Sequence, residues 1–88
     1  KRPAAESILS ELGLDWSQAA AMGDDWPDLP MLRRAALACV PATAHAEALA
    51  LAHHVTARAP GMGAVRELCD LLLVASGHYA TELEMAAR

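Results

Sequence analysis

The apolar residues of this chain recur at two spacings, and each spacing indicates a different kind of element. Residues 2–15 (RPAAESILSELGLD) follow the i, i+3, i+4, i+7 rule of a helix at Ala5, Ile8, Leu9 and Leu12. Residues 63–77 (GAVRELCDLLLVASG) place Val65, Leu68, Leu72 and Ala75 on one helical stripe. A glycine follows each pattern, Gly13 and Gly77, as is common at helix C-termini. Both segments are therefore predicted to be helices.

Shorter apolar runs favour strands. Residues 17–22 (SQAAAM), 37–41 (LACVP) and 53–57 (HHVTA) are short and are bounded by turn-forming residues. Helical spacing returns at residues 28–36 and 43–52, with Thr43 as the expected N-cap of the second segment. This alternation, with connections of about 2–6 residues, is typical of α/β units. We expect one domain with a parallel sheet flanked by helices, and a tail at residues 78–88 that forms a last helical turn or a mobile arm.

Charge and cysteine content narrow the expected partners. The formal net charge is −4, and no basic stripe is present that would release counterions from a phosphate backbone, so nucleic acid is not an expected partner. No apolar run reaches the ~20 residues that cross a bilayer, so no membrane partner is expected either. Cys39 and Cys69 lie far apart without a CxxC spacing, which is typical of reduced thiols and indicates a cytoplasmic protein.

An acidic segment follows the first expected strand. Asp24, Asp25 and Asp28 lie within five positions, directly after Gly23. At the carboxyl end of a parallel strand they would occupy the place where open α/β sheets bind ligands. Their mutual repulsion favours a bound cation, and Mg²⁺ suits carboxylate oxygen ligands. The alternative is a solvated turn in which Asp25 and Asp28 cap the next helix through its amides.

Three stretches also resemble a known family. Residues 23–32 (GDDWPDLPML) resemble the fourth motif of the haloacid dehalogenase (HAD) superfamily, an acidic GDDxxD signature at a strand end. Residues 44–56 (AHAEALALAHHVT) and 59–77 (APGMGAVRELCDLLLVASG) resemble the C-terminal part of its 3-deoxy-D-manno-octulosonate 8-phosphate phosphatase subfamily. That subfamily usually has two adjacent glycines where this chain has Pro60 before Gly61. The resemblance implies that residues 1–88 form the C-terminal portion of a Rossmann-like (HAD-like) parallel sheet.

The resemblance also implies roles for individual residues. Asp24 would be the direct Mg²⁺ ligand, and Asp25 and Asp28 would support the metal directly or through water. Lys1 corresponds to the third-motif lysine and would hold the nucleophile and the phosphate near each other. The family's first motif, DxDGT, supplies the nucleophilic aspartate and does not occur in this sequence. The 88-residue chain alone is therefore expected to be inactive.

The glycine-bearing turn before the last predicted helix is a candidate substrate-binding segment. Gly61 and Gly63 offer backbone amides, and Arg66 follows at the expected helix start, where a guanidinium group and amides can meet an anion. The alternative for Arg66 is an intrahelical pair with Asp70 at i+4.

Together these observations favour a segment of a Mg²⁺-dependent phosphomonoester hydrolase. The resemblance implies a phosphorylated sugar acid as substrate, a role in lipopolysaccharide precursor biosynthesis and a homotetrameric assembly. The alternative is a non-catalytic module that binds a metal or phosphate, or that assembles through its alanine-rich faces.

Overall fold

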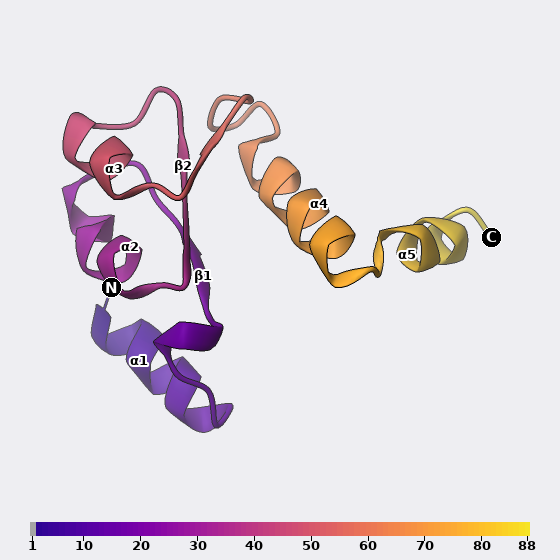
Figure 1. The fold of residues 1–88 in the computed structure, drawn as a ribbon, viewed down its shortest axis with the longest axis horizontal. Helices are drawn as coiled ribbons and strands as arrows, with labels where there is room; N and C mark the ends of the chain where they lie inside the picture. The colour runs from indigo at the N-terminus through magenta and orange to yellow at the C-terminus, as the bar shows by residue number, and fades with distance from the viewer. Residues whose placement is uncertain (1) are drawn as a thin grey trace.

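The computed structural model describes residues 2–88, which form a small sheet with helices around it (Figure 1). In chain order the elements are α1 (Arg2–Glu11), η1 (Trp16–Gln18), β1 (Ala20–Met22), η2 (Trp26–Asp28), α2 (Leu29–Arg34), β2 (Leu37–Pro41), α3 (Ala46–Leu51), β3 (His54–Thr56), α4 (Ala64–Ser76) and α5 (Tyr79–Ala86). The two 3₁₀ helices, η1 and η2, flank β1.

The three strands form one parallel sheet in the order β1-β2-β3. Ala21 pairs with Ala38 across β1 and β2, and Val40 pairs with Val55 across β2 and β3. Because the strands are parallel, the segments that follow them all leave from the same edge of the sheet. The prediction of an α/β fold with a parallel sheet flanked by helices is confirmed.

The core lies where α2 and α3 pack against β2 and against each other. It consists of Leu32, Ala38, Val40 and Ala48, each at most 1% exposed. β2 lies between the other two strands and is covered by helices, which explains why its sequence is a continuous apolar run. We call residues 20–56, from β1 to β3, the central region.

Two predicted starts differ from the structure by at least two residues. β1 begins at Ala20 rather than at residue 17, because Asp15 accepts a hydrogen bond from the amide of Ser17 (2.9 Å) and caps η1 there. The N-cap of α3 is His45 rather than Thr43. The chain first makes a turn after β2, in which the amide of Ala44 donates to the carbonyl of Pro41 (3.0 Å), so the helix begins later.

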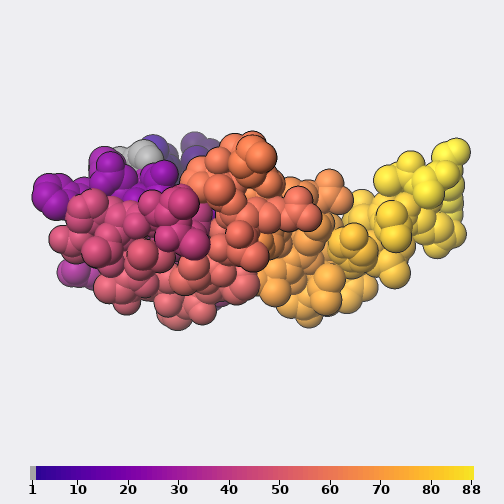
Figure 2. Space-filling model, turned by 90° about the horizontal axis from the view of Figure 1, so that it is seen from above, coloured from indigo at the N-terminus to yellow at the C-terminus, as the bar shows by residue number. Residues whose placement is uncertain are grey.

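The ends of the chain pack less closely than the central region. α1 forms as predicted but contains no buried residue, and α4 buries only Ala64 and Leu68 of its thirteen. The tail forms an eight-residue helix, α5, rather than a last turn, and this helix has no buried residue. α4 and α5 lead away from the sheet (Figure 1) and project from the rest of the molecule (Figure 2), and we call them the arm.

The shape of the molecule reflects this arm. The radius of gyration is 13.9 Å, whereas a compact chain of this length is expected to have one of ~12 Å. Within residues 2–88, no helix has the length and apolar content needed to cross a membrane.

Candidate functional site

A small cavity lies at the carboxyl edge of the sheet, between the acidic segment and the turn before α4. Its volume is about 160 Å³. It is lined by residues from β1 and its following loop, from the end of β2, and from the start of the arm: Met22, Gly23, Asp24, Pro41, Pro60, Gly61, Ala64 and Val65. The fold therefore brings together Asp24 and Gly61, two residues that the sequence predicted for the site and that lie far apart along the chain.

Asp28 shapes the acidic segment from within. Its side chain is buried, with the residue only 4% exposed, and its Oδ2 accepts hydrogen bonds from the amides of Asp24 (3.0 Å) and Asp25 (3.3 Å). A Cβ atom at Gly23 would lie 2.3 Å from the Cβ of Asp28, so only glycine fits at that position. These amide donors stabilise the charge of the carboxylate and hold the loop in a tight turn.

Asp25 acts as a helix cap. Its Oδ1 accepts a hydrogen bond from the amide of Trp26 (2.7 Å), and it is the N-cap of η2 in a capping box with Asp28. The capping alternative therefore describes Asp25 well. For Asp28 it holds at η2, where the carboxylate accepts the amide of the N-cap Asp25, but not at α2, to which Asp28 gives no side-chain cap.

Among the three aspartates of this segment, Asp24 is the one that lines the cavity. Its side chain is exposed and makes no hydrogen bond or ion pair with any residue from 2 to 88, while its carbonyl accepts the amide of His45 (2.9 Å). Over this described part of the chain, no three His, Cys, Asp or Glu side chains form a group that would hold a metal ion. Mg²⁺ needs only one or two protein carboxylates, and Asp24 fits one such position. Further donors would come from outside the described residues.

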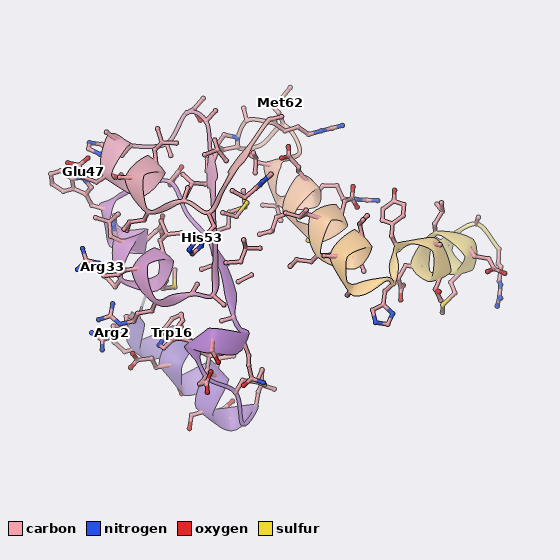
Figure 3. The ribbon with its side chains drawn as sticks, viewed as in Figure 1. Arg2, Trp16, Arg33, Glu47, His53 and Met62 are labelled. Atoms are coloured by element: carbon pink, nitrogen blue, oxygen red, sulfur yellow. The ribbon has the colours of Figure 1, made fainter. Side chains whose placement is uncertain are left out.

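The start of α3 supports the acidic segment from the other side. The indole Nε1 of Trp26 donates to Nδ1 of His45 (3.3 Å), and the two rings meet edge to face with centroids 5.4 Å apart. The carboxylate of Glu47 lies next to His45, and Glu47 is on the outer side of α3, well away from the turn that carries Met62 (Figure 3). The loop after β1 is thus held by the side chain of His45 as well as by its amide.

The turn before α4 depends on two glycines. Gly61 and Gly63 have φ angles of +76° and +104°, which side chains other than glycine rarely adopt. Gly61 lines the cavity with Asp24, whereas Gly63 is the N-cap of α4. Between them, Met62 is 73% exposed and lies at the outer tip of the turn (Figure 3).

Arg66 lies in a different place from the acidic segment. It lines a separate cavity between α4 and α5, together with residues such as Tyr79 and Leu83. Its Nε donates to Oδ1 of Asp70 (2.8 Å), and this carboxylate raises the pKa of the guanidinium group. The structure therefore forms the intrahelical pair that was the alternative for Arg66. Lys1, the predicted catalytic cation, lies outside the described residues.

A family model described as haloacid dehalogenase-like hydrolase matches residues 1–68, more than three quarters of the chain. The chain belongs to this family. The matched span includes the acidic segment, the whole sheet and the first turn of α4, so the HAD resemblance read from the sequence is confirmed.

Relatives within the HAD family point to one subfamily. The chain is 40% identical over 74 residues to 3-deoxy-D-manno-octulosonate 8-phosphate phosphatase KdsC of Escherichia coli, a match that covers 84% of this chain and 39% of that protein. The solved structure of the phosphatase of that name from Yersinia pestis has a TM-score of 0.84 at 39% identity, covering 88% of this chain and 42% of that one.

A third relative was solved with bound groups. The structure of 3-deoxy-D-manno-octulosonate 8-phosphate phosphatase from Moraxella catarrhalis in complex with a magnesium ion, a phosphate ion and a KDO molecule has a TM-score of 0.90 at 30% identity. The match covers 97% of this chain and 49% of that one. The HAD chain described here thus spans about two fifths of the length of the curated relatives that it matches.

Sequence reasoning missed two residues of this HAD chain, Glu67 and His54, that contact each other beside the turn before α4. Glu67 on α4 binds the backbone at the start of the turn that carries Gly61. An acid in the first turn of a helix is common, so its position carries no distinctive signal. His54 on β3, which contacts Glu67, was likewise without a motif in the sequence.

Proposed function

We propose that this chain is the C-terminal part of a HAD-type phosphatase core, and that the whole protein hydrolyses the phosphate ester of a phosphorylated sugar acid with the help of Mg²⁺. The observation that carries the proposal is the exposed Asp24 carboxylate at the carboxyl edge of the sheet, in a chain that is 40% identical to named phosphatases. Because the chain spans about two fifths of those relatives, the activity is proposed for the protein that contains it.

Each side chain has a defined task in this proposal. The carboxylate of Asp24 binds the metal, while Asp25 and Asp28 hold the backbone that carries it and so support the metal indirectly. A bound Mg²⁺ would neutralise negative charge on the phosphoryl oxygens. In this chain the carboxylate of Asp24 is the group held in place for that ion. The nucleophile belongs, by resemblance, to the family's first motif, which this sequence does not contain.

Three further roles are part of the same proposal. The turn with Gly61 and Gly63 contacts the substrate, which is supported by the position of Gly61 opposite Asp24 in one cavity. Lys1 holds the nucleophile and the phosphate together, a role that rests on the resemblance alone. Arg66 remains a candidate for a substrate contact only if its pair with Asp70 opens, since it lines another cavity.

The proposed substrate class is that of 3-deoxy-D-manno-octulosonate 8-phosphate, the compound in the names of the relatives, and the proposed role is in lipopolysaccharide precursor biosynthesis. The Moraxella catarrhalis relative was solved with magnesium, phosphate and KDO, which supports the same metal and the same product class here. Membership of a hydrolase family does not favour the alternative of a non-catalytic module. A cytoplasmic location stays a prediction, in keeping with the two free thiols.

We further propose a homo-oligomer, with a tetramer implied by the resemblance. Its support is the exposure of large apolar side chains along the arm, where Val74, Leu83 and Met85 are all more than half exposed. Sedimentation equilibrium of the gene product that contains residues 1–88 (below, the gene product) tests this proposal. A monomer at micromolar concentration would contradict it.

The proposed function is tested by replacing Asp24 with Asn in the gene product. Loss of a metal-binding charge that is worth several kcal/mol in the transition state predicts a fall in kcat on the order of 100-fold or more. The same variant is expected to bind Mg²⁺ more weakly by isothermal titration calorimetry. The 88-residue chain alone is expected to be inactive in the same phosphate-release assay.

Asp15→Asn serves as the matched control. Like Asp24, Asp15 is an exposed aspartate, but it caps η1, precedes β1 and so lies at the opposite edge of the sheet. Its replacement is expected to leave kcat within about twofold of the unmodified protein, since surface substitutions away from the site have small effects. Full activity and unchanged Mg²⁺ affinity in Asp24→Asn would refute the proposed role of Asp24.

A further inference from the structure

The turn that faces Asp24 receives little support from burial. Among residues 57–63, which connect β3 to α4, none is buried and most are exposed. Two of its glycines have positive φ angles, and glycine restricts the unfolded backbone less than any other residue. Something other than apolar packing must therefore fix the position of Gly61 relative to Asp24.

Glu67 provides that fixation at the start of the turn. Its Oε1 accepts a hydrogen bond from the amide of Arg58 (3.0 Å), and its Oε2 accepts one from the amide of Ala57 (3.1 Å). Oε2 also lies 3.1 Å from Nε2 of His54 on β3. One carboxylate on α4 thus joins the helix to the end of the strand and to the two residues that follow it. The His54 contact, followed by the Arg58 amide, lowers the pKa of Glu67.

Neighbouring contacts close the turn around the same helix start. The amide of Glu67 donates to the carbonyl of Gly63 (2.9 Å), and the hydroxyl of the buried Thr56 donates to the carbonyl of Arg58 (2.7 Å). The side chain of Arg58 lies close to Gly63. A Cβ atom added at Gly63 would be 3.0 Å from Cδ of Arg58. Both ends of the turn are therefore tied to Glu67, by its side chain at one end and by its backbone at the other.

We propose that Glu67 is a positioning residue of the phosphatase site: by holding the amides of Ala57 and Arg58 against α4, its carboxylate sets the place of Gly61 opposite Asp24. This inference rests on the proposed function. Glu67 does not line the cavity, so it acts through the backbone of residues 57–63 and not by contact with the substrate.

The chemistry of the side chain makes this role specific to glutamate. A carboxylate has two acceptor oxygens and accepts all three hydrogen bonds, whereas a glutamine amide has one acceptor oxygen and an NH₂ group that cannot accept from a backbone amide. Glu67→Gln keeps the size of the side chain and removes at least one of the three contacts. It therefore separates the positioning role from packing.

The experiment measures the turn and the reaction separately in the gene product. Amide hydrogen exchange, resolved by NMR, reports on Ala57, Arg58 and Gly61, and phosphate release from a sugar phosphate reports on kcat and KM. In Glu67→Gln the amides of Ala57 and Arg58 are expected to exchange faster. A misplaced binding turn is expected to lower kcat/KM about 10- to 100-fold, mainly through KM. Glu84→Gln, on the exposed face of α5, is the matched control and is expected to change neither readout.

A second variant covers the case in which Glu67→Gln does not fold. His54→Phe keeps a ring of similar shape and removes only the contact of Nε2 with Glu67. We expect a fall in kcat/KM of about threefold in the same direction, equivalent to the loss of part of one hydrogen bond.

The outcomes distinguish this inference from the proposed function. Faster exchange together with a higher KM supports the positioning role. Unchanged kcat/KM in the folded variants, while Asp24→Asn is inactive, overturns the role of Glu67 and leaves the proposed function in place. A gene product that releases no phosphate from any sugar phosphate overturns the proposed function, and the role of Glu67 in it falls as well.

Discussion

The central region and the arm differ in how their apolar residues are used. In the central region, Leu32 and Val40 are almost fully buried between the sheet and α2 and α3. In the arm, Val74 and Leu83 are 62% and 58% exposed. Both regions have helical or strand periodicity in the sequence, so periodicity reports which face of an element is apolar and does not report whether anything covers that face. The candidate site lies at the boundary between the two regions.

The largest expected effect is on the free energy of unfolding, which should fall much more for a substitution in the central region than for one in the arm. Leu32→Ala removes a fully buried side chain from the core and is expected to lower the free energy of unfolding of the gene product by about 2–5 kcal/mol. If the arm stays uncovered in the gene product, Val74→Ala changes this free energy by less than about 0.5 kcal/mol, because little apolar area is lost from a contact. Urea unfolding followed by circular dichroism measures both. A loss at Val74 as large as that at Leu32 would show that another part of the assembly covers the arm.

A smaller effect is expected at the glycine that precedes the acidic segment. Gly23→Ala would bring its Cβ within 2.3 Å of the Cβ of Asp28, and forcing such a contact in a packed region is expected to cost about 1–3 kcal/mol. The variant should also move the amide NMR signals of Asp24 and Asp25, which Asp28 binds.

Gly13→Ala is the matched control outside the central region. Gly13 has a positive φ of +69° but open space around it, so its replacement carries backbone strain of about 1 kcal/mol and no collision. The signals of Asp24 and Asp25 are expected to stay in place. Equal stability losses with no shift at Asp24 in Gly23→Ala would mean that the acidic segment tolerates a side chain at this position.

The smallest expected effect is the pH dependence of the stability that Glu67 contributes by linking the arm to the central region. The folded pKa of Glu67 lies below its ordinary value of 4.5, through hydrogen bonds from His54 and from the amide of Arg58. A carboxyl group with a lowered folded pKa stabilises the fold above its unfolded pKa, and this contribution is lost as the pH falls through the folded value. Besides His54, the Cys39 thiol on β2 is a titratable group within electrostatic reach.

We therefore expect a stability difference between the unmodified protein and Glu67→Gln that is constant near neutral pH and shrinks below pH 4.5. Urea unfolding at a series of pH values measures it, with Glu84→Gln as the control that lacks this dependence. A difference that stays constant down to about pH 3 would show that the charge of Glu67 does not strengthen the link between β3 and α4.

Local patterns were sufficient to predict most elements and the class of the fold. The continuous apolar run at residues 37–41 became the central strand, and the stripe that includes Leu68 became α4. The N-cap of α3 was predicted at Thr43, but it is His45. The turn after β2 depends on a backbone hydrogen bond that no propensity describes. For the tail, a last helical turn or a mobile arm was predicted, but α5 begins as a separate helix after Gly77.

The composition of the candidate site was predictable, whereas the roles of its three aspartates were predictable only in part. Three aspartates lie close together in the sequence, and this cluster was interpreted either as a metal site or as a capping turn. The resemblance already singled out Asp24 as the direct ligand, and the structure added that Asp24 lines the cavity while Asp25 and Asp28 bind backbone amides. Three carboxylates in one short segment look equivalent in a sequence, whereas a turn can direct only some of them outward.

By itself the sequence determined the order of helices and strands, the acidic segment at a strand end and the family, because these depend on spacing along the chain and on short motifs. The tertiary structure alone decided that Gly61 and Asp24 line one cavity, that Arg66 lines another and that Glu67 ties the turn to β3. These facts join residues from different strands and helices, and their distances are set by sheet register and helix packing, which no local pattern encodes.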